Sequence, residues 1–296
     1  MKGSAPGPLD TVPVIMDGGM GSELELRGYT VPKAPWWSAW NLKATPEAVS
    51  QIHADYARAG ATVHTTNTFR TKRINIGPEW EHLTRVAYRL CRDAVPSHHF
   101  VAGSISPVSH CYRPTEAPPD TRIFHREMAA LLSSLGVDIL LCETFAALTE
   151  AFTALDECVK TGTPAWISFT SGPQNDLLTP REFANAARHA VECGAQCVLI
   201  NCTPALAILP YLKSIESLPV PKGVMANAGG VEDGIGWSDE PSGADRYAQL
   251  ACEWYQAGAT IIGGCCGIRP AHIRAVAQAL SETSIQPSAL SSQPEL

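Results

Sequence analysis

The sequence predicts an α/β protein that folds as one (β/α)₈ barrel of the TIM type, and two observations carry this prediction. Eight short apolar runs alternate along the chain with amphipathic stretches, and several of these stretches end in the same glycine signal. No glycine-rich phosphate loop follows the first run, which makes an open, doubly wound sheet the weaker alternative. The count of eight units favours closure into a barrel.

The predicted strands are short and mostly do not alternate between polar and apolar residues, as expected for parallel strands covered on both faces. In such a barrel the residues at the carboxyl ends of the strands share one face, and active sites lie there. The eight predicted strands are Val14–Asp17, Thr62–Thr66, Val101–Ile105, Ile139–Glu143, Ala165–Phe169, Cys197–Cys202, Gly223–Asn227 and Thr260–Gly264.

Amphipathic helices are predicted between these strands. Over Pro46–Ala59, the residues Val49, Ile52 and Tyr56 form an apolar stripe at helical spacing. The stretches Pro180–Cys193 and Asp245–Ala257 show the same pattern. Glycine just past a helix ends it in the left-handed conformation, and four helices are expected to end in this way, at Gly60, Gly136, Gly194 and Gly258.

The barrel is predicted to span residues 12–283, with disordered tails at 1–11 and 284–296. The formal net charge of −7, without a run rich in Lys and Arg, argues against nucleic acid or an anionic membrane as a partner. The sequence contains neither an apolar stretch of the ~20 residues that span a bilayer nor the apolar core of a secretory signal. We therefore expect a cytoplasmic protein, and the oligomeric state is left open.

Three of the ten cysteines stand at predicted strand ends, Cys202 after the sixth strand and Cys265 with Cys266 after the eighth. Glycines around Cys265 and Cys266 let the backbone turn, so that both neighbouring side chains can face one point. Three thiolates with one open position form the donor set of a catalytic zinc site, whereas structural sites usually have four protein ligands. Two alternatives stay open: buried cysteines without a metal, or a strained redox pair of Cys265 and Cys266. Cys111 lies in a Pro-rich loop, a position compatible with exposure, and has no predicted role.

Two acids, Asp17 and Glu143, end apolar strands. A buried carboxylate needs a cationic or hydrogen-bonding partner, and a substrate ammonium would serve. Backbone amides of Gly18 and Gly19 lie next to Asp17 in the sequence and suit a carboxylate. The combination describes recognition of an amino acid, and the alternative for each acid is a structural salt bridge or a backbone cap.

Five segments, in order along the chain, resemble the homocysteine S-methyltransferase family, which includes betaine-dependent and S-methylmethionine-dependent enzymes and the homocysteine module of cobalamin-dependent methionine synthase. They are Asp17-Gly18-Gly19-Met20-Gly21-Ser22-Glu23-Leu24, Thr65-Thr66-Asn67-Thr68-Phe69, Glu143-Thr144-Phe145, Asn201-Cys202 and Gly263-Gly264-Cys265-Cys266-Gly267. The resemblance implies that zinc is bound by Cys202, Cys265 and Cys266, the substrate amine by Asp17 and Glu143, and its carboxylate near Gly18 and Gly19. The segment around Asn227 is similar to the methionine-synthase module, and Asn227 is counted with the substrate-binding residues.

Two further features of the sequence bear on the identity of the methyl donor. Trp36, Trp37 and Trp40 follow the first strand, where aromatic faces can bind an onium cation or simply form a hydrophobic lid. Arg70 stands where the betaine enzymes place an aromatic residue, and a guanidinium there would repel a quaternary ammonium or pair with a donor carboxylate. The segment beginning at Trp37 resembles the S-methylmethionine-dependent branch.

The sequence thus predicts a zinc-dependent methyltransferase that makes methionine from homocysteine, with S-methylmethionine or S-adenosylmethionine as the favoured donor. A zinc-bound acceptor thiol loses its proton and can attack a methyl group on a good leaving group. Other donors (betaine, or a corrinoid or folate partner protein) and other acceptors (selenohomocysteine or another small thiol) remain alternatives. A non-catalytic barrel with structural zinc that acts as a binding module is the alternative from a different class.

Overall fold

The computed structural model describes residues 7–236 and 241–285 and shows eight parallel strands in one sheet. Their hydrogen-bonded order is β1-β8-β7-β6-β5-β4-β3-β2. A parallel bridge between Met16 and Val63 joins the two ends of this order and closes the barrel. The strands are β1 (Val14–Ile15), β2 (Val63–Thr65), β3 (Phe100–Ile105), β4 (Ile139–Phe145), β5 (Ala165–Phe169), β6 (Cys197–Pro204), β7 (Lys222–Asn227) and β8 (Ala259–Gly264).

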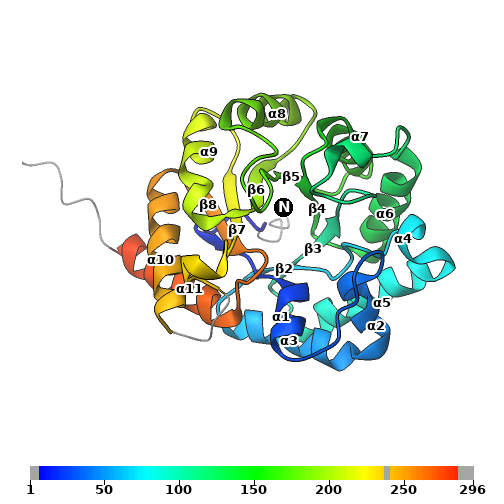
Figure 1. The fold of residues 1–296 in the computed structure, drawn as a ribbon, viewed down its shortest axis with the longest axis horizontal. Helices are drawn as coiled ribbons and strands as arrows, with labels where there is room; N and C mark the ends of the chain where they lie inside the picture. Colours follow the sequence, from blue (N-terminus) through cyan, green and yellow to red (C-terminus); the bar gives the residue numbers. More distant parts are fainter. Residues whose placement is uncertain (1–6, 237–240, 286–296) are drawn as a thin grey trace, which may run out of the picture.

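The helices form a ring around this barrel, as Figure 1 shows. They are α1 (Met20–Leu26), α2 (Asn41–Ala44), α3 (Pro46–Arg58), α4 (Arg73–Ile76), α5 (Trp80–Ala94), α6 (Arg122–Leu135), α7 (Leu148–Val159), α8 (Pro180–Glu192), α9 (Ile208–Ser214), α10 (Pro241–Gln256) and α11 (Pro270–Ile285). The predicted (β/α)₈ barrel is confirmed, and Gly60, Gly136, Gly194 and Gly258 all have positive φ, as the helix-end signal requires.

Two apolar clusters hold the fold together. The larger one lies between the strands and the helices and includes Val49, Ile52 and Tyr56 of α3, the predicted stripe. The smaller one fills the inside of the barrel, where Trp166 is fully buried among short aliphatic side chains. Because side chains fill the interior, the barrel is a solid core rather than a pore.

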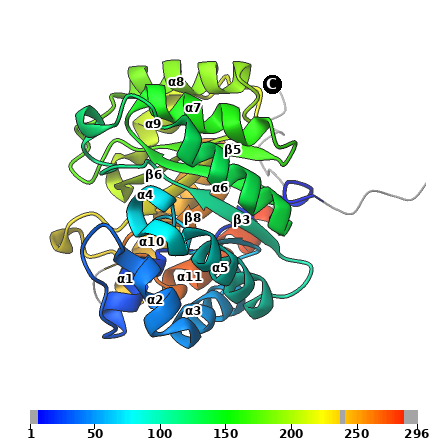
Figure 2. The same ribbon diagram turned by 90° about the vertical axis from the view of Figure 1, so that its right-hand side faces the viewer.

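The N-terminal segment predicted to be a disordered tail is described from residue 7 onwards. Leu9 packs against the apolar cluster inside the barrel. Figure 2 shows this segment at one end of the barrel and α1, with the loop that follows it, at the other. The rest of that tail, residues 1–6, lies outside the described residues, as does 286–296 of the C-terminal tail. Across 7–236 and 241–285, the structure contains no helix with the length and apolar character needed to cross a bilayer.

Candidate active site

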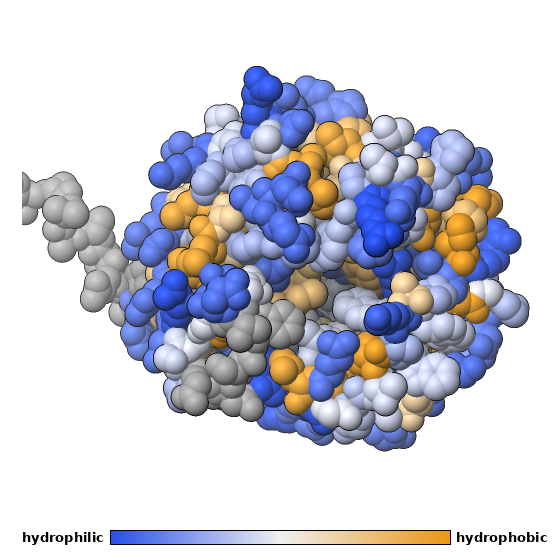
Figure 3. Space-filling model, in the orientation of Figure 1, coloured by the Kyte–Doolittle hydropathy of each residue, from blue (hydrophilic) through white to orange (hydrophobic). Residues whose placement is uncertain are grey.

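A cavity of about 330 Å³ opens at the carboxyl ends of the strands. Figure 3 shows this face of the molecule, which is hollowed near the centre of the ring of helices. Nearly all of the predicted site residues line the cavity: Asp17, Gly18, Gly19, Trp37, Arg70, Glu143, Cys202, Cys265 and Cys266. The same cavity is thus lined by residues as far apart in the sequence as Asp17 and Cys266, which are 249 positions apart.

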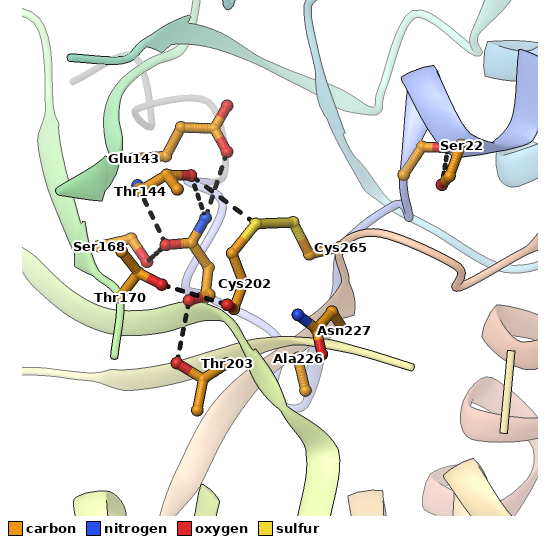
Figure 4. The surroundings of a disulfide bond; sticks show 12 residues. Ser22, Glu143, Thr144, Ser168, Thr170, Cys202, Thr203, Ala226, Asn227 and Cys265 are labelled. Carbon is orange, nitrogen blue, oxygen red and sulfur yellow. Dashed lines mark hydrogen bonds between the residues drawn. A yellow bond between two sulfur atoms is a disulfide. The ribbon is translucent and has the colours of Figure 1, made fainter. Parts of the chain in front are cut away.

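The three predicted cysteine ligands form one cluster. The sulfur atoms of Cys202, Cys265 and Cys266 all lie within 4.8 Å of one another. Cys202 and Cys265 are joined in a disulfide with their Cα atoms 5.6 Å apart (Figure 4). Cys266 is a free thiol. The redox alternative had paired Cys265 with Cys266. The structure shows a different pair, formed between β6 and the turn after β8, with β7 between the two strands.

An unusual backbone conformation directs Cys202 into the cavity. Cys202 has φ of +48°, a left-handed value that a residue with a side chain rarely adopts. The pairing of β6 with β7 shifts register between Asn201 and Pro204 at the same place. In a regular strand Asn201 and Cys202 would face opposite sides of the sheet, whereas this irregularity lets both side chains face the inside.

Glycines allow the chain after β8 to turn sharply towards β1. A Cβ atom on Gly263 would lie 2.5 Å from the Cβ of Met16, and one on Gly264 would lie 2.2 Å from Cγ2 of Ile268. The turn itself is closed by a hydrogen bond from the N–H of Ile268 to the carbonyl of Cys265, at 3.1 Å. The predicted role of these glycines in placing the two cysteines is therefore consistent with the geometry.

Asn201 connects the cysteine cluster to the acid of β4, although sequence reasoning gave it no role of its own. Its Oδ1 accepts hydrogen bonds from the N–H of Thr144 at 3.0 Å and from Ser168 Oγ at 2.8 Å. Its Nδ2 donates to Thr144 Oγ1 at 2.7 Å and to Glu143 Oε2 at 3.4 Å. Thr144 also has positive φ, at 64°, and its hydroxyl points to the sulfur of Cys202 in Figure 4.

The two predicted acids are buried at the floor of the cavity. Asp17 accepts hydrogen bonds from the N–H of Thr65 at 2.8 Å and from its hydroxyl at 3.0 Å. Burial nevertheless raises the pKa of Asp17 to about 7, because desolvation outweighs these bonds. Glu143 accepts a hydrogen bond from the hydroxyl of Ser104. Burial raises the pKa of Glu143 to about 6, against the lowering effects of that bond and of the charge of Lys72.

The salt-bridge alternative for these acids finds no support, because within the described ranges neither carboxylate has an ion-pair partner. Asp17 does bond a backbone amide, so the capping alternative describes part of its role. The N–H of Gly19 donates to the carbonyl of Ile268 at 3.2 Å, which engages one of the two amides predicted to hold a carboxylate. A side chain on Gly18 would lie 2.4 Å from the same carbonyl, so close packing also requires this glycine.

One wall of the cavity is aromatic and basic. The ring of Trp37 meets Phe69 edge to face, with centroids 5.5 Å apart. The guanidinium of Arg70 lies over the same Phe69 ring, 5.2 Å from its centroid. Trp36 and Trp40 pack against each other outside the set of lining residues, so Trp37 alone of the three predicted tryptophans lines the cavity.

Two expectations differ from the structure. Asn227 ends β7 as predicted, but it is not among the residues that line the cavity, and its Oδ1 accepts a hydrogen bond from Gly229 at 2.9 Å. Cys111 is buried and lines the cavity together with His110 and Tyr112, whereas its Pro-rich loop had suggested exposure. A hydrogen bond from the N–H of Val108 to Glu150, at 2.8 Å, holds the loop inward. Such a contact between distant segments cannot be predicted from a local sequence pattern.

Comparisons with known proteins show the family to which the chain belongs. A family model described as homocysteine S-methyltransferase matches residues 14–280. The chain is 30% identical over 291 residues to S-methylmethionine–homocysteine S-methyltransferase of Pongo abelii, which covers 90% of this chain and 78% of the relative. It is 31% identical over 302 residues to betaine–homocysteine S-methyltransferase 1 of Rattus norvegicus, covering 90% and 72%. The oxidised form of the homocysteine methyltransferase MmuM from Escherichia coli is similar in structure, with a TM-score of 0.74 and 26% identity, covering 92% of this chain and 99% of that one.

Proposed function

We propose that this chain, which belongs to the homocysteine S-methyltransferase family, transfers a methyl group from a small onium donor to homocysteine and so makes methionine. The observation that carries the proposal is the set of residues that line the cavity at the strand ends. Three cysteine sulfurs, two buried acids without ion-pair partners and an aromatic wall line the same 330 Å³ space. These are the groups needed to bind a thiol, an amine and an onium methyl group.

The residues present fit a zinc ion. Cys202, Cys265 and Cys266 would hold it, since three clustered sulfurs with a fourth position left for substrate match a catalytic zinc site. When bound, zinc would lower the pKa of the acceptor thiol, so that the thiolate is present at neutral pH. A site built to be structural would usually supply a fourth protein ligand, which is why the donor set favours an enzyme over a binding module.

The disulfide must be opened before these residues can bind a metal. Two electrons and two protons, supplied by a thiol reductant, convert the bond between Cys202 and Cys265 into two thiols and give three ligands with Cys266. We infer that the protein works in a reducing compartment and place it in the cytoplasm, where thiols are kept reduced.

Homocysteine is positioned by the acids and by the cysteine cluster. Asp17 and Glu143, in their ionised forms, would accept hydrogen bonds from the substrate ammonium. The backbone amide of Gly18, which follows Asp17 in the chain and lines the same cavity, would bind the carboxylate. With the amino-acid end fixed there, the side-chain sulfur reaches towards the three cysteines. Ser104 and Asn201 fix the orientation of the Glu143 carboxylate, so little reorganisation is needed on binding.

The donor is most simply a sulfonium compound. In the transfer, a lone pair of the acceptor sulfur forms the new S–CH₃ bond, and the pair of the breaking bond stays on the donor sulfur as a neutral thioether. Trp37 would bind the sulfonium cation through its ring face, a contact worth roughly 0.5–2 kcal/mol. The relatives do not choose between donors, because an S-methylmethionine enzyme and a betaine enzyme are 30% and 31% identical to this chain.

The test is methionine formation from homocysteine by the reduced, zinc-loaded protein with S-methylmethionine, S-adenosylmethionine or betaine as the donor. We expect turnover with a sulfonium donor and a loss of roughly two- to thirtyfold in kcat/KM for that donor in Trp37→Ala. Trp40→Ala is the matched control, since Trp40 lies outside the cavity and is 38% exposed. Absence of methionine with every donor would contradict the proposed activity, and efficient use of betaine alone would contradict the sulfonium preference.

A further inference from the structure

Arg70 carries a positive charge that nothing in the described protein neutralises. Its side chain is only 7% exposed, and it lines the cavity. Its Nη1 donates to the carbonyl of Ser109 at 3.0 Å, and its buried Nε has no hydrogen-bond partner. A buried guanidinium that lacks both a carboxylate and a full set of acceptors is costly, unless a ligand supplies them.

Three other buried or half-buried cations, in contrast, have protein partners for their charge or their donors. Arg27 is paired with Glu23 at 2.7 Å, and Arg269 is paired with Glu23 at 2.9 Å. Lys72 is fully buried but donates to the carbonyl of Phe69 at 2.8 Å and to Ser106 Oγ at 2.7 Å, and it does not line the cavity. Arg70 is therefore the cation of this group that faces open space with unused donors.

The cavity has an acidic and a basic part. Asp17 and Glu143 lie close enough for the charge of Glu143 to contribute to the raised pKa of Asp17. Besides burial, the charge of Arg70 lowers the pKa of Lys72 and of His110, so the groups with positive charge or the capacity for it gather around Arg70. Phe69 lies between Arg70 and Trp37 and makes one continuous wall of the three side chains.

In the pose proposed above, homocysteine uses the acidic part of the cavity. The ammonium and carboxylate of homocysteine are attached to the same carbon atom, so a carboxylate whose ammonium is held by Asp17 and Glu143 stays at the acidic part. The guanidinium is left for the second substrate. The onium centre of that substrate is itself cationic, so it gains from Arg70 only if the molecule also carries a negative group.

We propose that Arg70 binds a carboxylate of the methyl donor, so that this protein selects sulfonium donors that carry a carboxylate over those that carry a cation alone. This inference rests on the proposed methyl transfer and names the class of its donor. Phe69 and the Ser109 carbonyl hold the guanidinium in place, and the part of Arg70 that lines the cavity is available to the carboxylate oxygens. A charge-assisted pair of this kind discriminates by about ten- to a hundredfold.

The experiment compares two donors that differ only in the carboxylate: S-methylmethionine and its decarboxylated analogue, (3-aminopropyl)dimethylsulfonium. Dissociation constants are measured by calorimetry on the reduced, zinc-loaded full chain. The wild type should bind S-methylmethionine about ten- to a hundredfold more tightly than the analogue. In Arg70→Gln the ratio should fall close to one, and in Arg70→Lys, which keeps the charge but loses the planar fork, it should be intermediate.

Arg73→Gln is the control, because Arg73 belongs to the same segment but is 47% exposed and paired with Glu127 at 2.8 Å. It should leave the wild-type ratio unchanged. A wild-type ratio near one, no binding of either donor by the wild type, or an unchanged ratio in Arg70→Gln would overturn the inference. Homocysteine affinity and zinc content are measured in the same variants; if these persist while the donor ratio fails, the proposed function stands and only the role of Arg70 is lost.

Discussion

At the scale of single residues, the site depends on polar side chains that are buried without charged partners. Asp17 and Glu143 are held by hydroxyl and amide groups rather than by cations. Burial favours the neutral, protonated form of both acids in the free protein. A bound substrate ammonium would favour their ionised form instead, because it supplies an opposite charge. Asn201 contributes by joining the Glu143 carboxylate to the backbone of Thr144, next to the sulfur of Cys202.

Replacing either acid by its amide should weaken homocysteine binding by about ten- to a hundredfold, because each charge-assisted hydrogen bond contributes about 1.5–3 kcal/mol. The variants are Asp17→Asn and Glu143→Gln, and the measurement is calorimetric titration of the zinc-loaded protein with homocysteine. Zinc content should change little. Wild-type affinity in both variants would assign the two acids a structural role.

The raised pKa of Asp17 also predicts how stability depends on pH. Folding moves this pKa from 3.8 to about 7, so the folded state binds the proton more tightly than the unfolded state. The contribution of Asp17 to stability is therefore full below pH 3.8 and is lost as the pH rises through about 7. Urea unfolding of the ligand-free protein should show a free energy of unfolding that falls over this interval, and Asp17→Asn should reduce the fall. An identical pH dependence in the two proteins would contradict the assignment.

At the scale of elements, the ends of β4, β6 and β8 leave regular strand geometry and so deliver their side chains to one point. Thr144 and Cys202 take left-handed backbone conformations where β4 and β6 shift register. β8 ends in Gly263 and Gly264, which allow β1 to approach. The three cysteine sulfurs therefore come together because the backbone is irregular at the ends of otherwise regular strands.

The close approach of β1 and β8 can be tested with Gly263→Ala. The added methyl group would lie 2.5 Å from the Cβ of Met16 and 2.9 Å from the carbonyl of Asp17, both fixed to the backbone. We expect a destabilisation of about 1–3 kcal/mol, and reduced zinc affinity because Cys265 moves. Gly103→Ala on β3 is the control, since its new methyl group would meet only the side chain of Leu132, at 3.0 Å. Equal stability and zinc affinity in the two variants would argue against a special role for the contact.

The sequence allowed much of this to be predicted, for reasons that lie in its local patterns. Apolar runs and helix-ending glycines such as Gly60 report local conformation, and the barrel topology then gathers the strand ends without further information. The left-handed turn at Cys202 and the inward position of Cys111 depend on contacts between distant segments. For that reason the side-chain network around Asn201 and the lining role of the loop after β3 could not be predicted.

At the scale of the whole molecule, the residues that stabilise the barrel differ from the polar residues and cysteines that line the cavity. The apolar clusters inside and outside the sheet do not include Cys265 or Cys266. The barrel should therefore stay folded when the cysteine cluster is changed. Because the same face holds the acids, the sulfurs and Arg70, the substrates can be bound side by side with their reacting atoms between them.

The central claim is that Cys202, Cys265 and Cys266 together form a metal site on which methyl transfer to homocysteine depends. The most direct measurement is zinc content and methionine formation in the same reduced samples of wild type, Cys202→Ala, Cys265→Ala and Cys266→Ala, with Cys193→Ala as a control outside the cavity. We predict about one zinc per chain and turnover in the wild type and the control, and loss of most of both in each cluster variant, with circular dichroism showing a folded barrel throughout. Full methyl transfer by a cluster variant, or by wild-type protein stripped of zinc, would contradict the account.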